Sequence, residues 1–325
     1  MDLFSMAKGG DRRALGKLLT IIENEPSKAV EILSKVYRLD REANVVGVSG
    51  IPGAGKSSLI SQLILQFRKM KKRVGVLAID PSSTFTKGAI MGDRIRMGSF
   101  ENDPEVFVRS VATRGQTGGV ARSTRDAIRL MDAVGYQVII VETVGAGQLD
   151  IDIQKIADVA LVVLIPGAGD IIQASKAGLI EIGDIVVVNK ADLSGADLAV
   201  QELRTWISFN VNGKVNSANS WKPPVLKTNS MTGDGVKDII TSILRYLEHA
   251  KKTGSFHKRR EEQEYWEVLD RLNMVLWDKV IEPVTQEYKK VIKDGLWKKN
   301  LSPYSAANYL FELIQKEIGD AKTTK

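Results

Sequence analysis

Short apolar runs alternate with amphipathic segments through the middle of the chain. The apolar runs are rich in valine and isoleucine and are bounded by glycine, proline or aspartate, which is typical of buried strands. The segments between them repeat apolar residues at helical spacing. This alternation predicts an α/β fold, a mostly parallel sheet with helices on both faces. The expected strands are 45–49, 74–79, 106–110, 137–141, 159–164, 185–188 and 224–227.

Helical patterns flank this region on both sides. Residues 14–37 predict two short helices divided near Pro26, and residues 256–282 predict a longer one. A last helix is expected over 303–318, where Ser302 and Pro303 match an N-cap and a first-turn proline. The pattern divides the chain into an N-terminal helical extension over 1–43, an α/β domain over 44–250 and a C-terminal helical arm over 251–325.

Apolar residues recur at helical spacing within the arm, and they leave its role open. They either pack against the α/β domain or form the contact surface of a homodimer. These residues are Trp266, Leu269, Leu272, Val275 and Leu276.

A glycine-rich loop joins the first expected strand to the helix that follows it. Its sequence over 50–57, Gly-Ile-Pro-Gly-Ala-Gly-Lys-Ser, is the pattern of a phosphate-binding P-loop. Glycines let the backbone curl, so that successive N–H groups surround phosphate oxygens at a helix N-terminus. We expect Lys56 to neutralise the β- and γ-phosphates and Ser57 to bind Mg²⁺. The expected nucleotide contacts of this segment are Gly50, Ile51, Pro52, Gly53, Ala54, Gly55, Lys56, Ser57 and Ser58.

A second motif, Asn-Lys-Ala-Asp over 189–192, follows the strand expected at 185–188. It therefore lies at the carboxyl edge of the sheet, where open α/β sheets bind ligands. The carboxylate of Asp192 has only acceptors, so it matches the two N–H groups on one edge of guanine, whereas adenine has no donor at its ring N1. With the P-loop, this motif predicts a GTPase. The expected base contacts are Asn189, Lys190 and Asp192, with backbone N–H groups of Ser230 and Met231 on the guanine carbonyl.

Composition narrows the class of protein. The chain has 325 residues, 43% of them hydrophobic and 26% charged, and no run of 18 apolar residues, so we expect a globular cytoplasmic protein without a membrane span. The net charge of +7 comes from basic residues interleaved with acids, which argues against a nucleic-acid partner. The absence of cysteine excludes disulfides and thiolate metal sites, and the two histidines do not form a metal cluster.

Three acids lie where a P-loop enzyme needs carboxylates for its metal and its attacking water. Asp80 ends the second expected strand, Asp93 lies in a loop, and Glu142 ends the fourth strand. Glu142 begins Glu-Thr-Val-Gly and takes the place of the aspartate in the Asp-x-x-Gly of GTPases, so we expect it to hold Mg²⁺ directly or through water. Gly145 would donate its N–H to the γ-phosphate and make 144–149 a switch. For Asp93, a solvated loop carboxylate is the alternative.

The residue that orients the attacking water is not settled by the motifs. Ras-like GTPases carry a glutamine directly after the switch glycine, but Ala146 stands at that position and Gln148 comes two residues later. We therefore expect slow intrinsic GTP hydrolysis, with Asp80 or Asp93 orienting the water and a partner completing the site.

The chain resembles the MeaB/ArgK family, the methylmalonyl-CoA mutase-associated GTPases. The resemblance spans about residues 10–250 in motif order. It rests on Gly50–Ser57, Ala-Ile-Asp-Pro-Ser-Ser over 78–83, Gly-Asp-Arg-Ile-Arg-Met over 92–97, Arg-Gly at 114–115 with Gly-Gly at 118–119, the segment 141–148, and Asn189–Asp192.

This resemblance implies a P-loop GTPase of the SIMIBI class that binds GTP or GDP with Mg²⁺ and forms a homodimer through C-terminal helices. It implies a chaperone of an adenosylcobalamin-dependent methylmalonyl-CoA mutase, or a related acyl-CoA mutase, that gates cofactor loading and protects or reactivates the mutase. It places Ser57, Asp80, Asp93 and Glu142 around Mg²⁺.

The segment 166–178 matches a second switch of the family that faces the mutase, with Gln173 and Lys176 as its polar candidates. Ile171-Ile172 and Ala174-Ser175 depart from the family pattern there, so a plain sheet-covering helix over 170–182 stays open. Two other functions compete with the chaperone: a P-loop kinase linked to basic-amino-acid transport, for which no acceptor site is readable, and a metallochaperone GTPase, against which the missing cysteines count.

Overall fold

The computed structural model describes residues 2–80, 100, 102–112, 119–143, 152–167, 178–211, 220–297 and 302–323. The chain forms two compact units, Met1–Gln263 and Glu264–Lys325, and each is described by itself. The division of the sequence near 43 and 250 stays a prediction.

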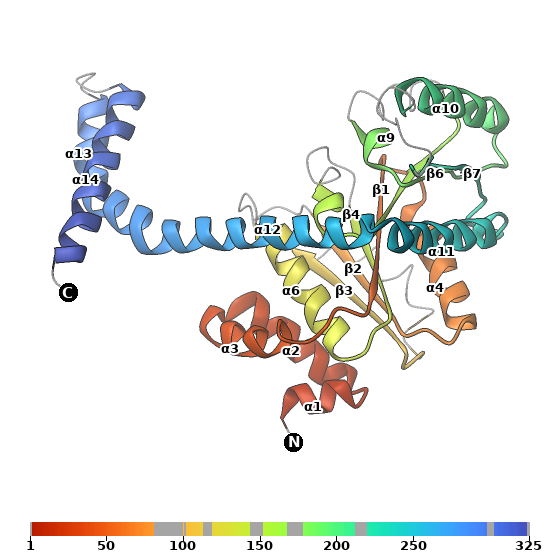
Figure 1. Cartoon of the computed structure of the whole chain (residues 1–325), viewed down its shortest axis with the longest axis horizontal. Helices are drawn as coiled ribbons and strands as arrows, with labels where there is room; N and C mark the ends of the chain where they lie inside the picture. Colours follow the sequence, from red (N-terminus) through yellow and green to blue (C-terminus); the bar gives the residue numbers. More distant parts are fainter. Residues whose placement is uncertain are drawn as a thin grey trace. The chain divides into compact units, whose positions relative to one another are not determined.

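The first unit is built on one seven-stranded sheet in the order β3-β2-β4-β1-β5-β6-β7 (Figure 1). Every pair of neighbouring strands in it is parallel. All seven expected strands are confirmed, and their ends differ from the expected ones by at most two residues. The strands are β1 Asn44–Gly50, β2 Val74–Asp80, β3 Val106–Ala112, β4 Val138–Thr143, β5 Val159–Leu164, β6 Ile185–Val188 and β7 Val225–Lys227.

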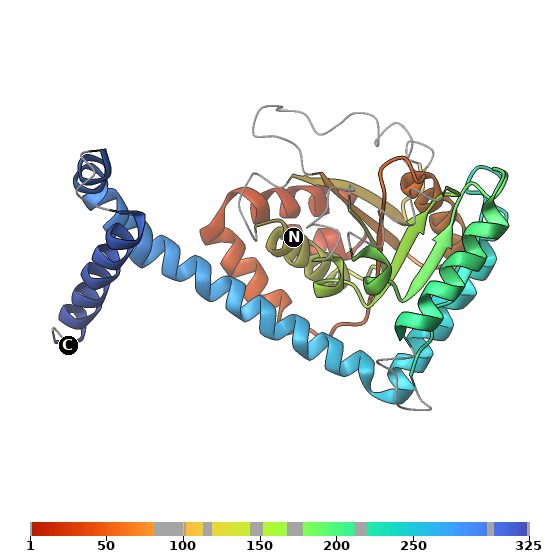
Figure 2. The same ribbon diagram turned by 90° about the horizontal axis from the view of Figure 1, so that it is seen from above.

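The direction of the chain explains how the helices cover both faces of the sheet. From β1 to β2 the chain crosses β4 in one direction, and from β3 to β4 it moves in the opposite direction. Because crossovers between parallel strands are right-handed, α4 and α6 must lie on opposite faces (Figures 1 and 2). Helix α11 packs against α4, and helices α2 and α3 pack against α6. The bounds are α4 Lys56–Lys69, α6 Gly119–Ala133, η2 Asp152–Lys155, α9 Leu179–Ile182, α10 Ala196–Val211 and α11 Val236–Thr253.

Layers on both faces account for the apolar runs of the sequence. Strands β4, β5 and β6 are buried along their whole length, and β1 is buried in all but its first residue. A strand covered on both sides needs apolar residues at every position, so it shows no alternation with polar ones. The central strands therefore form a rigid base from which the loops at their carboxyl ends project.

The N-terminal helices belong to this unit. The predicted break near Pro26 is confirmed, because α2 spans Arg12–Asn24 and α3 begins at Pro26 and ends at Val36. Helix α2 buries Leu15, Leu18 and Leu19, and Asp11 caps it by accepting from two backbone N–H groups of its first turn. A further short helix, α1 Leu3–Lys8, was not predicted.

Two arginines at the start of helix α12 (Ser255–Leu276) fix that helix to the amino edge of the sheet. Arg260 donates to both carboxylate oxygens of the buried Asp158, at 2.8 Å each, and Asp158 also accepts from the N–H of Val45 at 2.8 Å. Arg259 and Asp184 form a second such pair, at 2.7 and 3.0 Å. Burial lowers the pKa of Arg259, but the hydrogen bonds and charge of Asp184 outweigh this and hold the pKa above its ordinary value.

The second unit is helical. After α12, a π-helical turn, η3 Trp277–Ile281, leads into α13 Glu282–Trp297, and α14 spans Pro303–Thr323. The sequence predicted the helix that starts at Pro303 but not α13. Helices α13 and α14 pack together, with the rings of Tyr288 and Tyr309 edge to face at 6.2 Å. Within the described ranges, no helix of either unit is long and apolar enough to cross a membrane.

The Arg260–Asp158 pair gives a testable prediction for stability. Asp158→Ala leaves a guanidinium without its partner and the N–H of Val45 without its acceptor, so the free energy of unfolding should fall by about 3–5 kcal/mol. Lys35→Ala is the control, because the Lys35–Glu31 pair is exposed on both sides and its loss should cost at most about 1 kcal/mol. Chemical denaturation of both variants measures the difference, and equal losses would contradict the role given to Asp158.

Candidate functional site

The glycine-rich loop leaves the carboxyl end of β1 and enters α4, as predicted. Gly50, Gly53 and Gly55 all have positive φ angles, of 147°, 75° and 83°. A Cβ atom on Gly50 would stand 2.0 Å from the carbonyl oxygen of Val163 on β5, so the loop passes against the neighbouring strand. At position 50, glycine is therefore required both by the backbone conformation and by the space available.

Lys56 and Ser57, at the first two positions of α4, are buried inside this loop. The Nζ atom of Lys56 donates to the carbonyl oxygens of Gly50 and Ile51, at 2.8 and 3.2 Å, so the ammonium group lies over the loop. The Oγ atom of Ser57 donates to Glu142 Oε1 at 2.9 Å. The predicted cation and the predicted metal-binding hydroxyl are thus both on the inner side of the loop.

Glu142 lies next to the loop because β4 pairs with β1 and places Val48 opposite it. Its side chain is buried, and it presents a carboxylate oxygen beside the hydroxyl of Ser57. A hydroxyl and a carboxylate are ligands that suit Mg²⁺, which usually takes one or two protein groups and keeps several waters. In the described part of the chain, no three His, Cys, Asp or Glu side chains gather as a metal cluster.

Other predicted residues of the phosphate side are described only in part. Asp80 is the last residue of β2, and its strand pairs with β4 up to Ile79 opposite Thr143, so its backbone reaches the same edge of the sheet as Glu142. Its side chain, Asp93, Gly145, Gln148 and the predicted second switch with Gln173 and Lys176 lie outside the described residues.

Asn189 connects the phosphate side to the base side. Its side chain is completely buried, and its Nδ2 atom donates to the carbonyl oxygen of Ala54 at 2.7 Å and to Ser230 Oγ at 3.0 Å. Its Oδ1 atom accepts from the N–H of Ser230 at 3.0 Å. We predicted Asn189 as a base contact, but in this geometry its amide joins the glycine-rich loop to the loop between β7 and α11.

The other base-side residues lie beside Asn189, at the carboxyl ends of β6 and β7. Lys190 has a φ of 55°, a left-handed conformation that is uncommon for a residue with a side chain and turns the chain sharply after β6. Asp192 is exposed and accepts from Asn229 Nδ2 at 3.0 Å, while Met231 is 81% exposed. Asn229 belongs to the segment 228–231 that the sequence predicts to hold the guanine carbonyl through backbone N–H groups, but no role was predicted for its side chain.

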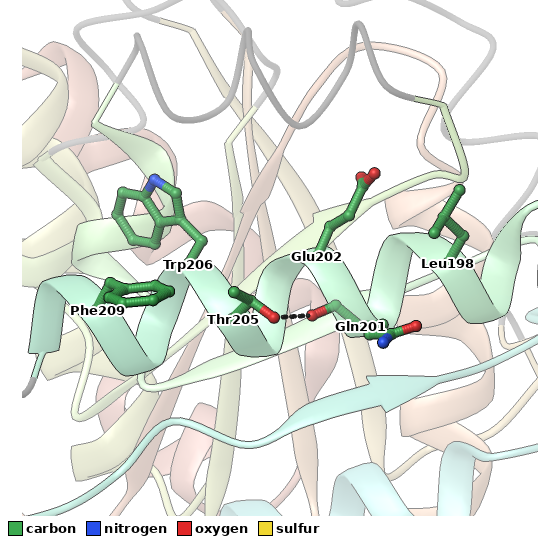
Figure 3. A pocket seen from close by; sticks show the side chains of 6 residues that line it. All are labelled: Leu198, Gln201, Glu202, Thr205, Trp206 and Phe209. Carbon is green, nitrogen blue, oxygen red and sulfur yellow. Dashed lines mark hydrogen bonds between the residues drawn. The ribbon is translucent and has the colours of Figure 1, made fainter.

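A separate groove on the outer side of α10 does not share this chemistry. It has a volume of about 560 Å³, and among the described residues of its lining Glu202 is the charged one (Figure 3). A lining with a single acid and several apolar groups does not attract phosphate, so the groove is not part of the nucleotide site. The lining residues are Leu198, Gln201, Glu202, Thr205, Trp206 and Phe209.

The family model of the methylmalonyl-CoA mutase-associated GTPase MeaB matches residues 15–287. A relative from Pyrococcus horikoshii, whose name classes it among the GTPases, is 44% identical over 96% of this chain and 98% of its own length. A relative from Caenorhabditis elegans, named as a mitochondrial homolog of methylmalonic aciduria type A protein, is 29% identical over 89% of this chain and 74% of its own length.

One solved structure, a crystal structure of an LAO/AO transport system kinase, matches with a TM-score of 0.70. It covers 96% of both chains at 23% identity, so the likeness bears on the fold alone. With the sheet order and the P-loop, it confirms the predicted α/β P-loop NTPase fold.

A matched pair of glycine substitutions tests the link between the two loops. Gly53→Ala and Gly55→Ala both put a side chain on a left-handed residue, which costs about 1–2 kcal/mol of unfolding free energy. The new Cβ has nothing within 4 Å at Gly53, but it would stand 2.4 Å from Asn189 Nδ2 at Gly55. Chemical denaturation of the nucleotide-free protein should therefore show a clearly larger loss for Gly55→Ala, and equal losses would argue against a fixed Asn189.

Proposed function

Because this chain belongs to the family of methylmalonyl-CoA mutase-associated GTPases, the MeaB family, and is a GTPase, we propose that it is the chaperone of an adenosylcobalamin-dependent acyl-CoA mutase. Methylmalonyl-CoA mutase is the partner that the family description and the name of the Caenorhabditis relative favour. In this proposal the GTP cycle changes the affinity of the chain for the mutase, gates loading of the mutase cofactor, and protects or reactivates the mutase.

The observation that carries the guanine part of the proposal is the bridge made by Asn189. It holds Ala54, in the glycine-rich loop, and Ser230, beside the base-reading segment, in one buried hydrogen-bonded unit. A nucleotide has its phosphates and its base at a fixed separation, so a site for it needs two rigidly related loops. The carboxylate of Asp192 then meets the two N–H groups of guanine.

The same geometry supports phosphate binding at the glycine-rich loop. Backbone N–H groups of residues 50–57 and the helix dipole of α4 attract the phosphates, and Lys56 supplies a positive charge over the β- and γ-phosphate oxygens. Ser57 and Glu142 would hold Mg²⁺, which neutralises charge on the phosphate oxygens during hydrolysis. Hydrolysis by the chain alone should be slow, because Ala146 stands where Ras-like GTPases have a water-orienting glutamine.

The second unit supports a homodimer. Its helices expose many large apolar side chains, and exposed apolar patches on soluble chains usually mark contact surfaces. A second copy of the same helices would bury these side chains in a self-complementary interface, which is the commonest form of oligomer. The exposed side chains are Tyr265, Trp266, Val268, Leu272, Val275, Leu276, Trp277, Leu296, Tyr304, Tyr309 and Phe311.

GTP turnover with and without the mutase tests the proposed function. The purified chain should hydrolyse GTP slowly, should not use ATP at the same rate, and should be accelerated about tenfold or more by methylmalonyl-CoA mutase from the same source. Lys56→Ala is the control that should abolish the accelerated rate. Fast hydrolysis without the mutase, or selective hydrolysis that the mutase leaves unchanged, would contradict the chaperone role, while a preference for ATP would contradict the base-reading role of Asp192.

Sedimentation equilibrium tests the homodimer. Phe311 is 59% exposed on α14, so Phe311→Asp should leave the fold intact but place a charge in the proposed interface and shift the protein from dimer to monomer. Val30→Asp is the matched control, since Val30 is 67% exposed on α3 of the first unit and its replacement should leave the mass unchanged. A wild-type chain that sediments as a monomer at micromolar concentration would rule the homodimer out.

A further inference from the structure

Asn229 lies between the two segments that would surround a base. It comes two residues after β7, and its backbone is fixed on both sides, because its N–H donates to Asp234 O at 3.0 Å and its carbonyl accepts from Gly233 N at 2.8 Å. The backbone of Asn229 is thus held in place by the loop itself.

The side-chain amide of Asn229 makes two hydrogen bonds of opposite kind. Its Oδ1 atom accepts from the backbone N–H of Met231 at 2.9 Å, and its Nδ2 atom donates to Asp192 Oδ1 at 3.0 Å. A backbone N–H is always a donor, so the amide oxygen must face Met231 and the NH₂ group must face Asp192. The orientation of the amide is thus decided by the chain itself.

Asp192 needs such a partner. Its side chain is exposed on a loop, and among the described residues Asn229 is the one whose side chain bonds to it. A carboxylate free to rotate would have to be ordered each time a base binds, and that ordering costs affinity. Each carboxylate oxygen accepts more than one hydrogen bond, so Oδ1 can be held by Asn229 and still accept from a base.

We propose that Asn229 is a positioning residue that orients the carboxylate of Asp192 towards the N–H edge of guanine and thereby sets nucleotide selectivity. The inference rests on the proposed role of Asp192 as the reader of guanine. Asn229 acts through Asp192 and is not assigned a contact with the nucleotide.

Asn229→Asp is the sharpest substitution for this purpose. It keeps the size of the side chain and an oxygen that accepts from Met231, but it turns a second carboxylate towards Asp192, and two carboxylates repel each other. The loop therefore keeps its internal hydrogen bond, while the orientation of Asp192 is lost. Thr232→Val is the matched control, because Thr232 lies in the same loop and bonds to Asp234 and to the backbone carbonyl of Asn229, but not to the Asn229 amide or to Asp192.

The experiment measures equilibrium binding of GTP, ITP and ATP to the full-length chain. Inosine lacks the 2-amino group of guanine, so ITP offers Asp192 one donor where GTP offers two. Asn229→Asp should weaken GTP binding about tenfold or more, weaken ITP binding less and leave ATP binding unchanged, whereas Thr232→Val should keep the GTP-to-ITP ratio within about twofold. Asn229→Ala should change the same ratio in the same direction by a smaller factor, which keeps the test valid if Asn229→Asp does not fold.

A double-mutant cycle with Asp192→Ala separates the inference from the proposal beneath it. If Asp192→Ala does not weaken GTP binding, the guanine-reading role of Asp192 itself is wrong. If Asp192→Ala weakens binding and neither Asn229 variant changes the GTP-to-ITP ratio, only the inference about Asn229 is wrong. If an Asn229 variant weakens GTP binding equally in the Asp192→Ala background, Asn229 acts through the loop at Met231, which also overturns the inference.

Discussion

The buried amide of Asn189 is the interaction on which the rest of the site depends. Both of its amide protons and its oxygen are used, on Ala54 in one loop and on Ser230 in another. The two loops come from strands β1 and β7, which lie on either side of β5 and β6 in the sheet. Removing the amide would leave buried polar groups without hydrogen-bond partners in both loops. The loss of this one side chain would therefore destabilise both loops together. The position of this amide also explains why residue 55 is a glycine, because any side chain there would displace the amide.

Polar side chains tie the chain together at both edges of the sheet, but they have different roles. At the amino edge, Arg259 pairs with Asp184 and Arg260 pairs with Asp158, and each acid also accepts a hydrogen bond from a strand N–H. These charges are therefore paired with one another within the fold. At the carboxyl edge, Asp192 is exposed and accepts a hydrogen bond from the side chain of Asn229. Chemistry is therefore expected at the carboxyl edge, as in other open parallel sheets, while the amino edge contributes stability.

The sequence predicted the sheet well because its central strands are covered on both faces. Such strands are apolar at almost every position, and strands β4, β5 and β6 stand out for that reason, although β4 ends in the polar residues Glu142 and Thr143. The P-loop was equally easy to predict, because its glycines meet a local requirement of the backbone for positive φ angles. The contacts of Asn189 and Asn229 could not be predicted from the sequence. They join residues that lie 135 positions apart for Asn189 and Ala54 and 37 positions apart for Asn229 and Asp192, and no local sequence pattern indicates which loops meet. Helix α13 was also missed, and in the structure it packs against α14.

In this arrangement, selectivity for the base and the response to GTP hydrolysis depend on different loops. In the proposed site the base lies at the loops after β6 and β7, whereas the phosphates lie at the loop after β1, beside the end of β4, where Ser57 bonds to Glu142. An exposed hydrogen bond to Asp192 contributes on the order of 1 kcal/mol, so discrimination against adenine must come chiefly from the donor that adenine lacks and the carboxylate that is then left unpaired. That penalty is the same before and after hydrolysis, because GTP and GDP carry the same base. A change of state on hydrolysis must therefore arise at the phosphate loops, and the Asn189 bridge is what keeps the base loops in place while it happens.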